Sequence, residues 1–208
     1  MQRVGILLKN KHKTMKVIFL DIDGVLNSEM FYRRRHKRRW LKFNTYYWRI
    51  KSKVKWVFNG FKYKYYSLPE YKINPKHRTF KYLFNRLKEE TDSSRWKWLV
   101  EFVKETDCKI CISSCWKHHF NNTEEWDIAF NLLGFPENTF VGITGDRRTL
   151  RGTEIKEWMD KNQPIEKYAI IDDDSDMLPE QMGSFFKTDN YYGISPNNLY
   201  QIKRHFEK

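Results

Sequence analysis

Three short polar clusters carry the residues best suited to chemistry, and each of them follows an apolar run of the chain. The clusters are Asp21 with Asp23, Ser113 and Ser114 with Lys117, and Asp172 with Asp173 and Asp174. Two carboxylates close together repel each other, which favours a bound cation or a shared proton. Carboxylate oxygens suit Mg²⁺, which also takes phosphate oxygens as ligands. Hydroxyl and ammonium groups suit an anion, so the clusters together indicate phosphoryl transfer with Mg²⁺ as cofactor.

The apolar runs before these clusters are typical of buried strands in a parallel sheet. Strands are predicted at residues 17–20, 109–112, 139–143, 168–171 and 185–188. Helices are predicted at residues 94–105, 123–133, 153–161 and 196–206. This alternation predicts an α/β fold, a Rossmann-like three-layer sandwich around a parallel sheet. Ligands of such sheets bind beyond the carboxyl ends of the strands, which is where the three clusters lie.

Each cluster also has a purely structural interpretation. Aspartates after strands are common turn formers, and two serines after a strand often belong to an ordinary loop. All three clusters occur in one chain, however, and each is preceded by an apolar strand. This conjunction favours a functional site over three unrelated loops.

Four motifs resemble those of a known group of enzymes. They are Asp21-Ile-Asp-Gly-Val-Leu, ISSCWK at 112–117, RGTEIKEW at 151–158 and IIDDDSD at 170–176. The first resembles the DxDGV motif of haloacid dehalogenase (HAD) superfamily phosphatases. The other three are similar to SSSWR, RxxEIxxW and IxDDD in the HAD domains of Swiss Army knife RNA-repair proteins. The likeness covers residues 16–27 and the chain from about residue 94 onward.

The resemblance implies a role for each acidic residue. Asp21 would be the nucleophile that forms an aspartyl-phosphate. Asp23 would protonate the leaving oxygen and then deprotonate the attacking water. Asp21, the backbone carbonyl of Asp23, Asp172 and Asp173 would hold Mg²⁺, which lets an anionic phosphate approach the carboxylates.

The resemblance also implies residues that bind the phosphoryl group. Ser113 would hydrogen-bond a phosphate oxygen, with Ser114 as the alternative. Arg151 would supply the cation, with Lys156 as the alternative. Lys117 stands where the similar domains usually have Arg, and it is a further substrate-binding candidate although Lys lacks the bidentate geometry of Arg.

Positive charge is concentrated in one segment. The 208 residues contain 39 Lys and Arg against 26 Asp and Glu, a net charge of +13. Residues 28–66 hold 13 of the basic residues and one acid, and therefore +12 of that charge, together with 13 aromatic residues. We therefore predict a catalytic core at 1–27 and 93–208, interrupted by an inserted cap for substrate recognition at 28–92.

A β-hairpin is predicted inside this insertion, because the chain alternates around Asn59-Gly60, a strong two-residue turn signal. The alternation places Lys53, Lys55, Lys62 and Lys64 on one face and aromatic residues on the other. The structural interpretation is that the aromatic face packs on the core while the lysines are solvated. The functional interpretation is a contact surface for a phosphate backbone, with rings that stack on the unpaired bases of RNA or DNA. An interfacial membrane helix is a weaker alternative, since the basic run 33–39 lacks interleaved apolar residues.

Composition also limits the setting of the chain. No run of 18 apolar residues is present, which excludes a membrane span of that kind. Three cysteines, an odd number, fit a reducing compartment, so a cytoplasmic protein is expected. Zinc binding by Cys108, Cys111 and Cys115 is disfavoured because Cys111 lies inside a predicted buried strand.

The sequence therefore predicts a magnesium-dependent phosphohydrolase that acts on phosphorylated nucleic-acid ends. Two alternatives stay open. One is a small-molecule phosphatase of the nucleotidase kind, whose cap would close on a mononucleotide. The other is a non-catalytic nucleic-acid-binding module on the same scaffold, which would have no need to keep all the acidic positions.

Overall fold

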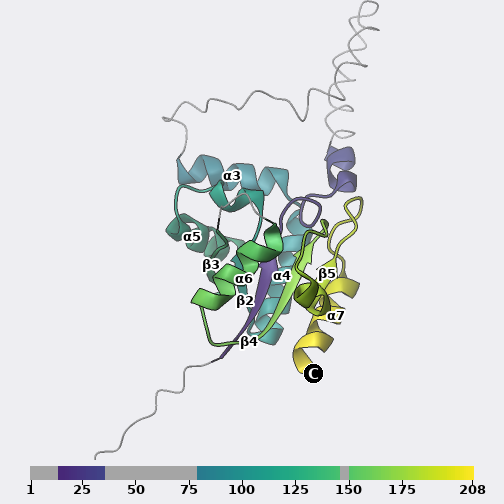
Figure 1. Ribbon diagram of the computed structural model, residues 1–208. Helices are drawn as coiled ribbons and strands as arrows, with labels where there is room; N and C mark the ends of the chain where they lie inside the picture. The colour runs from purple at the N-terminus through teal and green to yellow at the C-terminus, as the bar shows by residue number, and fades with distance from the viewer. Residues whose placement is uncertain (1–13, 36–78, 146–149) are drawn as a thin grey trace, which may run out of the picture.

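The computed structural model describes residues 14–35, 79–145 and 150–208. Within these ranges, five parallel strands form one sheet in the order β3-β2-β1-β4-β5. The strands are β1 (Met15–Leu20), β2 (Lys109–Ile112), β3 (Phe140–Ile143), β4 (Ile165–Asp172) and β5 (Phe185–Lys187). All the carboxyl ends therefore meet at one edge, which points upward in Figure 1.

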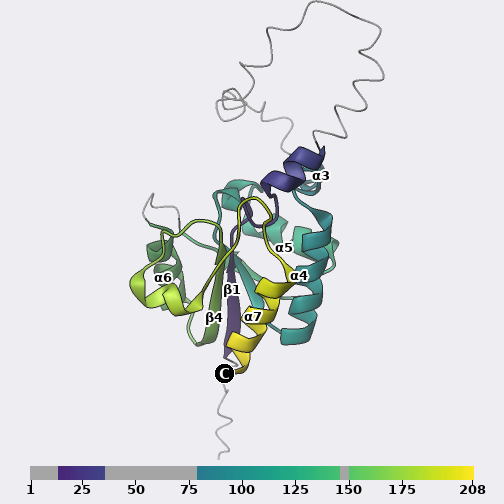
Figure 2. The ribbon, with the colours of Figure 1, turned by 90° about the vertical axis from the view of Figure 1, so that its right-hand side faces the viewer.

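Helices cover both faces of this sheet. They are α3 (Phe80–Glu90), α4 (Ser93–Thr106), α5 (Thr123–Leu133), α6 (Arg151–Lys161) and α7 (Pro196–Glu207). Two 3₁₀ helices, η2 (Cys115–His118) and η3 (Pro179–Ser184), follow β2 and β4. In Figure 2, α6 lies on one side of the sheet and α4, α5 and α7 lie on the other. The predicted Rossmann-like three-layer sandwich is confirmed.

The central strand β1 shows why both faces need a covering layer. Successive side chains of a strand point to opposite faces. Ile18 and Leu20 pack in the larger apolar cluster, with side chains of α4, α5 and α7. Val17 and Phe19 pack in the smaller cluster, where Trp158 of α6 meets Phe19 edge to face at 5.4 Å between ring centroids. The continuous apolar run thus places a two-sided strand directly before Asp21.

Local signals set the helix ends. Asn122 accepts the backbone N–H of Glu125 at the start of α5, and Gly134 ends that helix in a left-handed conformation at φ 95°. Helix α6 begins at Arg151, two residues earlier than the sequence predicts. This earlier start matters for the site, because it places Arg151 in the first turn of α6.

Helix α3 is not among the predicted helices, and it lies inside the predicted insertion at 28–92. Its Leu83 and Leu87 are buried in the same cluster as Ile18 and Leu20 of β1. Apolar packing of the core therefore extends into this stretch of the chain. The division into core and cap otherwise stays a prediction, because residues 36–78 lie outside the described residues.

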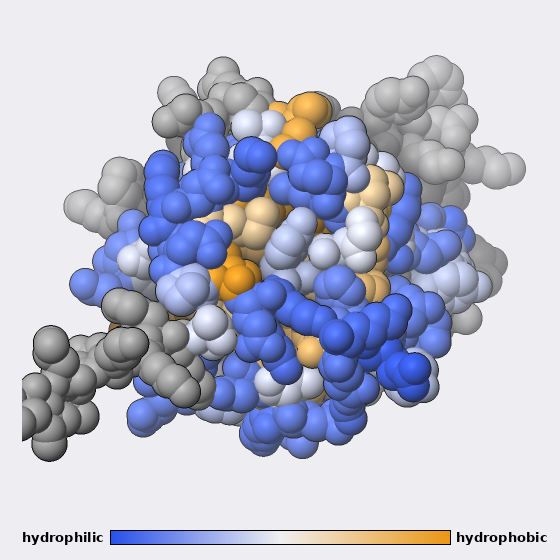
Figure 3. Space-filling model, turned by 60° about the horizontal axis from the view of Figure 1, so that its bottom comes forward, coloured by the Kyte–Doolittle hydropathy of each residue, from blue (hydrophilic) through white to orange (hydrophobic). Residues whose placement is uncertain are grey.

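Residues 29–35 are helical, and they overlap the start of the basic run 33–39. The predicted hairpin, with Lys53, Lys55, Lys62 and Lys64, lies outside the described residues. In the three described ranges, no helix combines the length and apolar character that crossing a bilayer requires. The end of the molecule opposite the carboxyl edge, brought forward in Figure 3, is mainly hydrophilic with small apolar patches between polar residues.

Candidate active site

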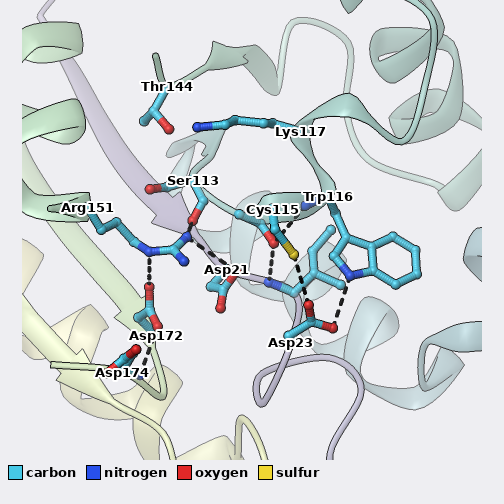
Figure 4. Close-up of polar contacts among 12 residues, drawn as sticks. Asp21, Asp23, Ser113, Cys115, Trp116, Lys117, Thr144, Arg151, Asp172 and Asp174 are labelled. Carbon is cyan, nitrogen blue, oxygen red and sulfur yellow. Dashed lines mark hydrogen bonds and ion pairs between the residues drawn. The ribbon is translucent and has the colours of Figure 1, made fainter. Parts of the chain in front are cut away.

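The three polar clusters of the sequence meet at the carboxyl edge of the sheet. Asp21 follows β1, Ser113 follows β2, and Asp172 is the last residue of β4. Since β1 lies between β2 and β4, these three side chains come from neighbouring strands. Figure 4 shows Asp21 in the middle of the group, with Asp172 on one side and Asp23 on the other.

Arg151 joins two of the clusters. Its Nη1 lies 3.5 Å from Asp21 Oδ1, and its Nε lies 2.9 Å from Asp172 Oδ2. Nη1 also donates to the backbone carbonyl of Ser113. Asp176 fixes the start of the helix that carries Arg151, because its Oδ2 accepts the Arg151 backbone N–H at 3.1 Å. The guanidinium is thus held between the strands that bear the two aspartates.

Burial makes the carboxylates of this group electrostatically costly. Asp21 is 4% exposed and Asp172 is 1% exposed. Burial raises the pKa of Asp21 to about 6, although Arg151 and a hydrogen bond with Ser114 lower it. Burial and the charge of Asp21 together raise the pKa of Asp172 to about 8. The two aspartates also raise the pKa of Arg151, against the opposing effect of burial.

Asp173 completes a set of oxygen ligands. Carboxylate oxygens of Asp21, Asp172 and Asp173 all lie within 4.8 Å of one another. Close, partly buried carboxylates with raised pKa values are the arrangement that a hard divalent cation relieves, so the donor set fits Mg²⁺. Gly24 makes room for the Asp173 side chain. Its φ is +65°, and a Cβ at this position would lie 2.2 Å from the Asp173 carboxyl group. The carbonyl of Asp23 as a further ligand stays a prediction.

The two serines differ in what their hydroxyls contact. Ser114 Oγ accepts the backbone N–H groups of Ile22 at 3.4 Å and of Trp116 at 3.3 Å, and so joins the loop after β1 to η2. Ser113 is 1% exposed, and its Oγ has no hydrogen-bond partner among the described residues. A buried hydroxyl without a partner costs free energy unless a ligand satisfies it. The geometry therefore favours Ser113 over Ser114 as the anion donor.

Asp23 is held on the other side of Asp21. Its Oδ1 accepts from Asn27 Nδ2 at 2.7 Å and from Trp116 Nε1 at 3.0 Å. Its Oδ2 accepts from Cys115 Sγ at 3.0 Å. Partial desolvation and the hydrogen bond to Asp23 raise the pKa of Cys115 to about 12, which keeps this thiol protonated as a donor. Three donors thus fix the orientation of the Asp23 carboxylate.

The chain that forms this geometry also matches the model of a known protein family. The model of the HAD domain in Swiss Army Knife RNA repair proteins matches residues 17–199. The chain belongs to this family. Comparisons with curated proteins and with solved structures gave no match. The family indicates a phosphohydrolase, and its span includes every polar cluster described above.

In this HAD domain, Lys117 lies apart from the carboxylates. Its Nζ pairs with Glu154 Oε2 at 2.8 Å and donates to the carbonyl of Gly145. Figure 4 shows the ammonium group directed toward Thr144 rather than toward Asp21. The substrate-binding role of Lys117 stays a prediction that this placement does not favour.

Lys156, the alternative to Arg151, lies on the outer surface of the HAD domain. Its side chain is 53% exposed and pairs with Glu180 at 3.4 Å. Arg151 contacts the acidic group directly, so the geometry favours Arg151 as the cation.

Several residues of the site were not assigned a role from the sequence. They are Asn27, Cys115, Trp116, Glu154 and Asp176. Cys115, Trp116, Glu154 and Asp176 lie within the motifs given above, so their position was a signal. No motif singles out Asn27, although its partner Asp23 lies only four residues before it.

Proposed function

We propose that this HAD domain is a magnesium-dependent phosphohydrolase that works through an aspartyl-phosphate at Asp21. The observation that carries the proposal is the contact of Arg151 with both Asp21 and Asp172 at one sheet edge, next to the buried Ser113, whose hydroxyl has no hydrogen-bond partner among the described residues. A nucleophile, a cation and a hydroxyl donor around one point are the groups that phosphoryl transfer requires.

In the first step, a carboxylate oxygen of Asp21 attacks phosphorus while the bond to the leaving oxygen breaks. Asp23 gives the leaving oxygen its proton. In the second step, Asp23 takes a proton from water, the water oxygen attacks phosphorus, and the bond to Asp21 breaks. Inorganic phosphate leaves, and both aspartates return to their starting state.

Arg151 and Ser113 would bind the non-bridging phosphoryl oxygens. The guanidinium already balances Asp21 and Asp172, so a phosphate can approach without facing two uncompensated carboxylates. Asp21, Asp172 and Asp173 would hold Mg²⁺, which when bound neutralises carboxylate charge and polarises the phosphoryl group. The three hydrogen bonds that Asp23 accepts hold its carboxyl group in one orientation beside Asp21.

Turnover of 4-nitrophenyl phosphate tests this proposal. We expect hydrolysis in Mg²⁺, loss of activity in EDTA, and recovery when Mg²⁺ is added in excess. The non-catalytic alternative predicts no turnover under any of these conditions. Hydrolysis that is indifferent to EDTA would contradict the magnesium role while leaving Asp21 to be tested separately.

We further propose that the substrate is a phosphorylated end of single-stranded RNA or DNA. The support is that residues 28–66 carry +12 of the net charge of +13, far more than a mononucleotide would need. The test is a panel of 3′-phosphorylated and 5′-phosphorylated oligonucleotides beside mononucleotides. Replacing Lys53, Lys55, Lys62 and Lys64 by Ser should weaken oligonucleotide binding and flatten its salt dependence, by about 0.7 in slope for each phosphate that is no longer neutralised. A preference for mononucleotides would favour the nucleotidase alternative.

A further inference from the structure

The loop 189–193 lies at the same edge of the sheet as the candidate active site. It follows β5 at the carboxyl edge of the sheet, on the side of the helical segment 29–35 (Figures 1 and 2). Just before the loop, Thr188 donates its backbone N–H to the Asp172 carbonyl at 2.8 Å and its hydroxyl to the Gly24 carbonyl at 3.1 Å. Just after it, Ile194 donates to the Val25 carbonyl at 3.0 Å. Both ends of the loop are therefore bonded to the segments that carry Asp21 and Asp172.

The backbone of this loop is also held internally. Asp189 Oδ1 accepts the backbone N–H of Tyr191 at 2.8 Å and of Tyr192 at 3.0 Å. The buried guanidinium of Arg95 donates to the carbonyl of Tyr192 and, at 2.9 Å, to the hydroxyl of Ser28. The conformation of the loop is thus fixed by a side-chain acceptor within it and a buried cation beneath it.

Two large rings are exposed on this fixed backbone. Tyr191 is 37% exposed and Tyr192 is 58% exposed. Their rings meet edge to face at 4.8 Å between centroids, so each limits the motion of the other. Exposed rings on an ordered backbone can be covered by a flat partner at little cost in conformational entropy.

The helical segment 29–35 brings positive charge to the same surface. Glu29 and Met30 donate backbone N–H groups to the carbonyls of Asn190 and Tyr191, at 3.1 and 3.0 Å. The guanidinium of Arg33, which also pairs with Glu29, lies 5.5 Å from the centroid of the Tyr191 ring. The basic and aromatic stretch 28–66 therefore begins on this loop.

We propose that Tyr191, Tyr192 and Arg33 form a stacking surface for an unpaired base of a single-stranded polynucleotide whose phosphorylated end occupies the site at Asp21. This inference rests on the proposed function and names the surface that would select its substrate. Aromatic rings stack on any base, and a cation beside them suits the phosphate backbone. A small aryl phosphate would reach Asp21 without touching this surface.

The test compares one long and one short substrate in the full chain. The variant Tyr191→Ala/Tyr192→Ala should raise the Kd for a labelled, phosphorylated hexathymidylate about tenfold or more. Its kcat/KM toward 4-nitrophenyl phosphate should stay within about twofold of the wild type. Tyr191→Phe/Tyr192→Phe keeps both rings and should bind like the wild type.

Tyr200→Ala is the matched control, because Tyr200 is a 60% exposed tyrosine on α7, in the groove between α4 and α7. It should leave both measurements unchanged. An unchanged Kd in the double alanine variant, or no binding by the wild type at low salt, would overturn the stacking surface. Failure of the proposed phosphatase would appear separately, as absence of aryl phosphate turnover, and binding by Asp21→Asn would still report on the tyrosines.

Discussion

Two cationic side chains, Lys117 and Arg151, lie near the carboxyl edge of the sheet, and they pair with different sets of carboxylates. Lys117 is paired with Glu154, and the two side chains are only 8% and 11% exposed. Arg151 is 22% exposed and lies between Asp21 and Asp172, two acidic residues that also belong to the candidate metal cluster. One cation thus completes a buried ion pair, whereas the other balances two carboxylates of the candidate metal cluster. The partner supplied by the fold, rather than the residue type, distinguishes these two cations.

The largest effect should follow from removing the cation of Arg151. Arg151→Gln should lower kcat/KM toward 4-nitrophenyl phosphate about 10²- to 10³-fold, because a charged donor to the phosphoryl group is removed. Steady-state kinetics in excess Mg²⁺ measures this, with Lys156→Gln as a matched control on the outer surface of the same helix. Activity near the wild-type level in Arg151→Gln would remove the distinction between the two cations.

Lys117 should show the opposite behaviour. Lys117→Met should reduce the free energy of unfolding by about 3 to 5 kcal/mol, because Glu154 is left buried without its cation. The double variant Lys117→Met/Glu154→Gln should recover most of that loss. Urea unfolding measures both, and activity of the folded protein should fall by less than about tenfold. Intact stability with a large loss of activity would instead assign Lys117 to substrate binding.

A smaller effect is expected from the hydrogen bond between Trp116 and Asp23. Trp116→Phe keeps an aromatic ring and removes the Nε1–H donor to Asp23, the proposed acid–base group. Turnover of an alkyl phosphate, whose leaving oxygen needs a proton, should fall roughly tenfold. Turnover of 4-nitrophenyl phosphate should change little, since that leaving group departs as an anion. Trp98→Phe on α4 is the control, and equal losses on both substrates would argue against a role through Asp23.

The stability of the folded chain should also depend on pH. In the folded chain the pKa values of Asp21 and Asp172 are raised to about 6 and about 8, above their ordinary value of 3.8. The folded state therefore binds more protons than the unfolded state, and stability falls as pH rises through this range. Between pH 6 and pH 8 the Tm of the protein in EDTA should fall by roughly 5 °C. Mg²⁺ should abolish the fall and Asp172→Asn should reduce it, whereas an equal slope in Asp172→Asn would place its origin elsewhere.

The sheet and most of the helices could be predicted because their signals are local. A continuous apolar run marks a strand buried on both faces, and Asn122 and Gly134 mark the ends of α5. Helix α3 was not among the predicted helices, because it lies inside the predicted insertion at 28–92. The spacing of Leu83 and Leu87, four residues apart, was a signal of its buried face.

Some features of the candidate site could likewise be predicted from the sequence, and others could not. Its acidic residues follow strands, so their convergence could be predicted from the topology of a parallel sheet. The pairings of Lys117 with Glu154 and of Asp23 with Asn27 could not be assigned, because both depend on side-chain orientation, and the first also joins residues 37 apart in the sequence. Sequence spacing therefore indicates which residues meet at an edge, but not which of them are already paired there.

The most direct test of the aspartyl-phosphate mechanism is the activity of Asp21→Asn on 4-nitrophenyl phosphate in excess Mg²⁺. Asn keeps the size of the side chain and removes the nucleophilic carboxylate, so folding should be preserved. We expect a loss of kcat of about 10⁴-fold or more, together with no phosphorylated form of the protein after acid quenching. Full activity in Asp21→Asn would contradict the mechanism.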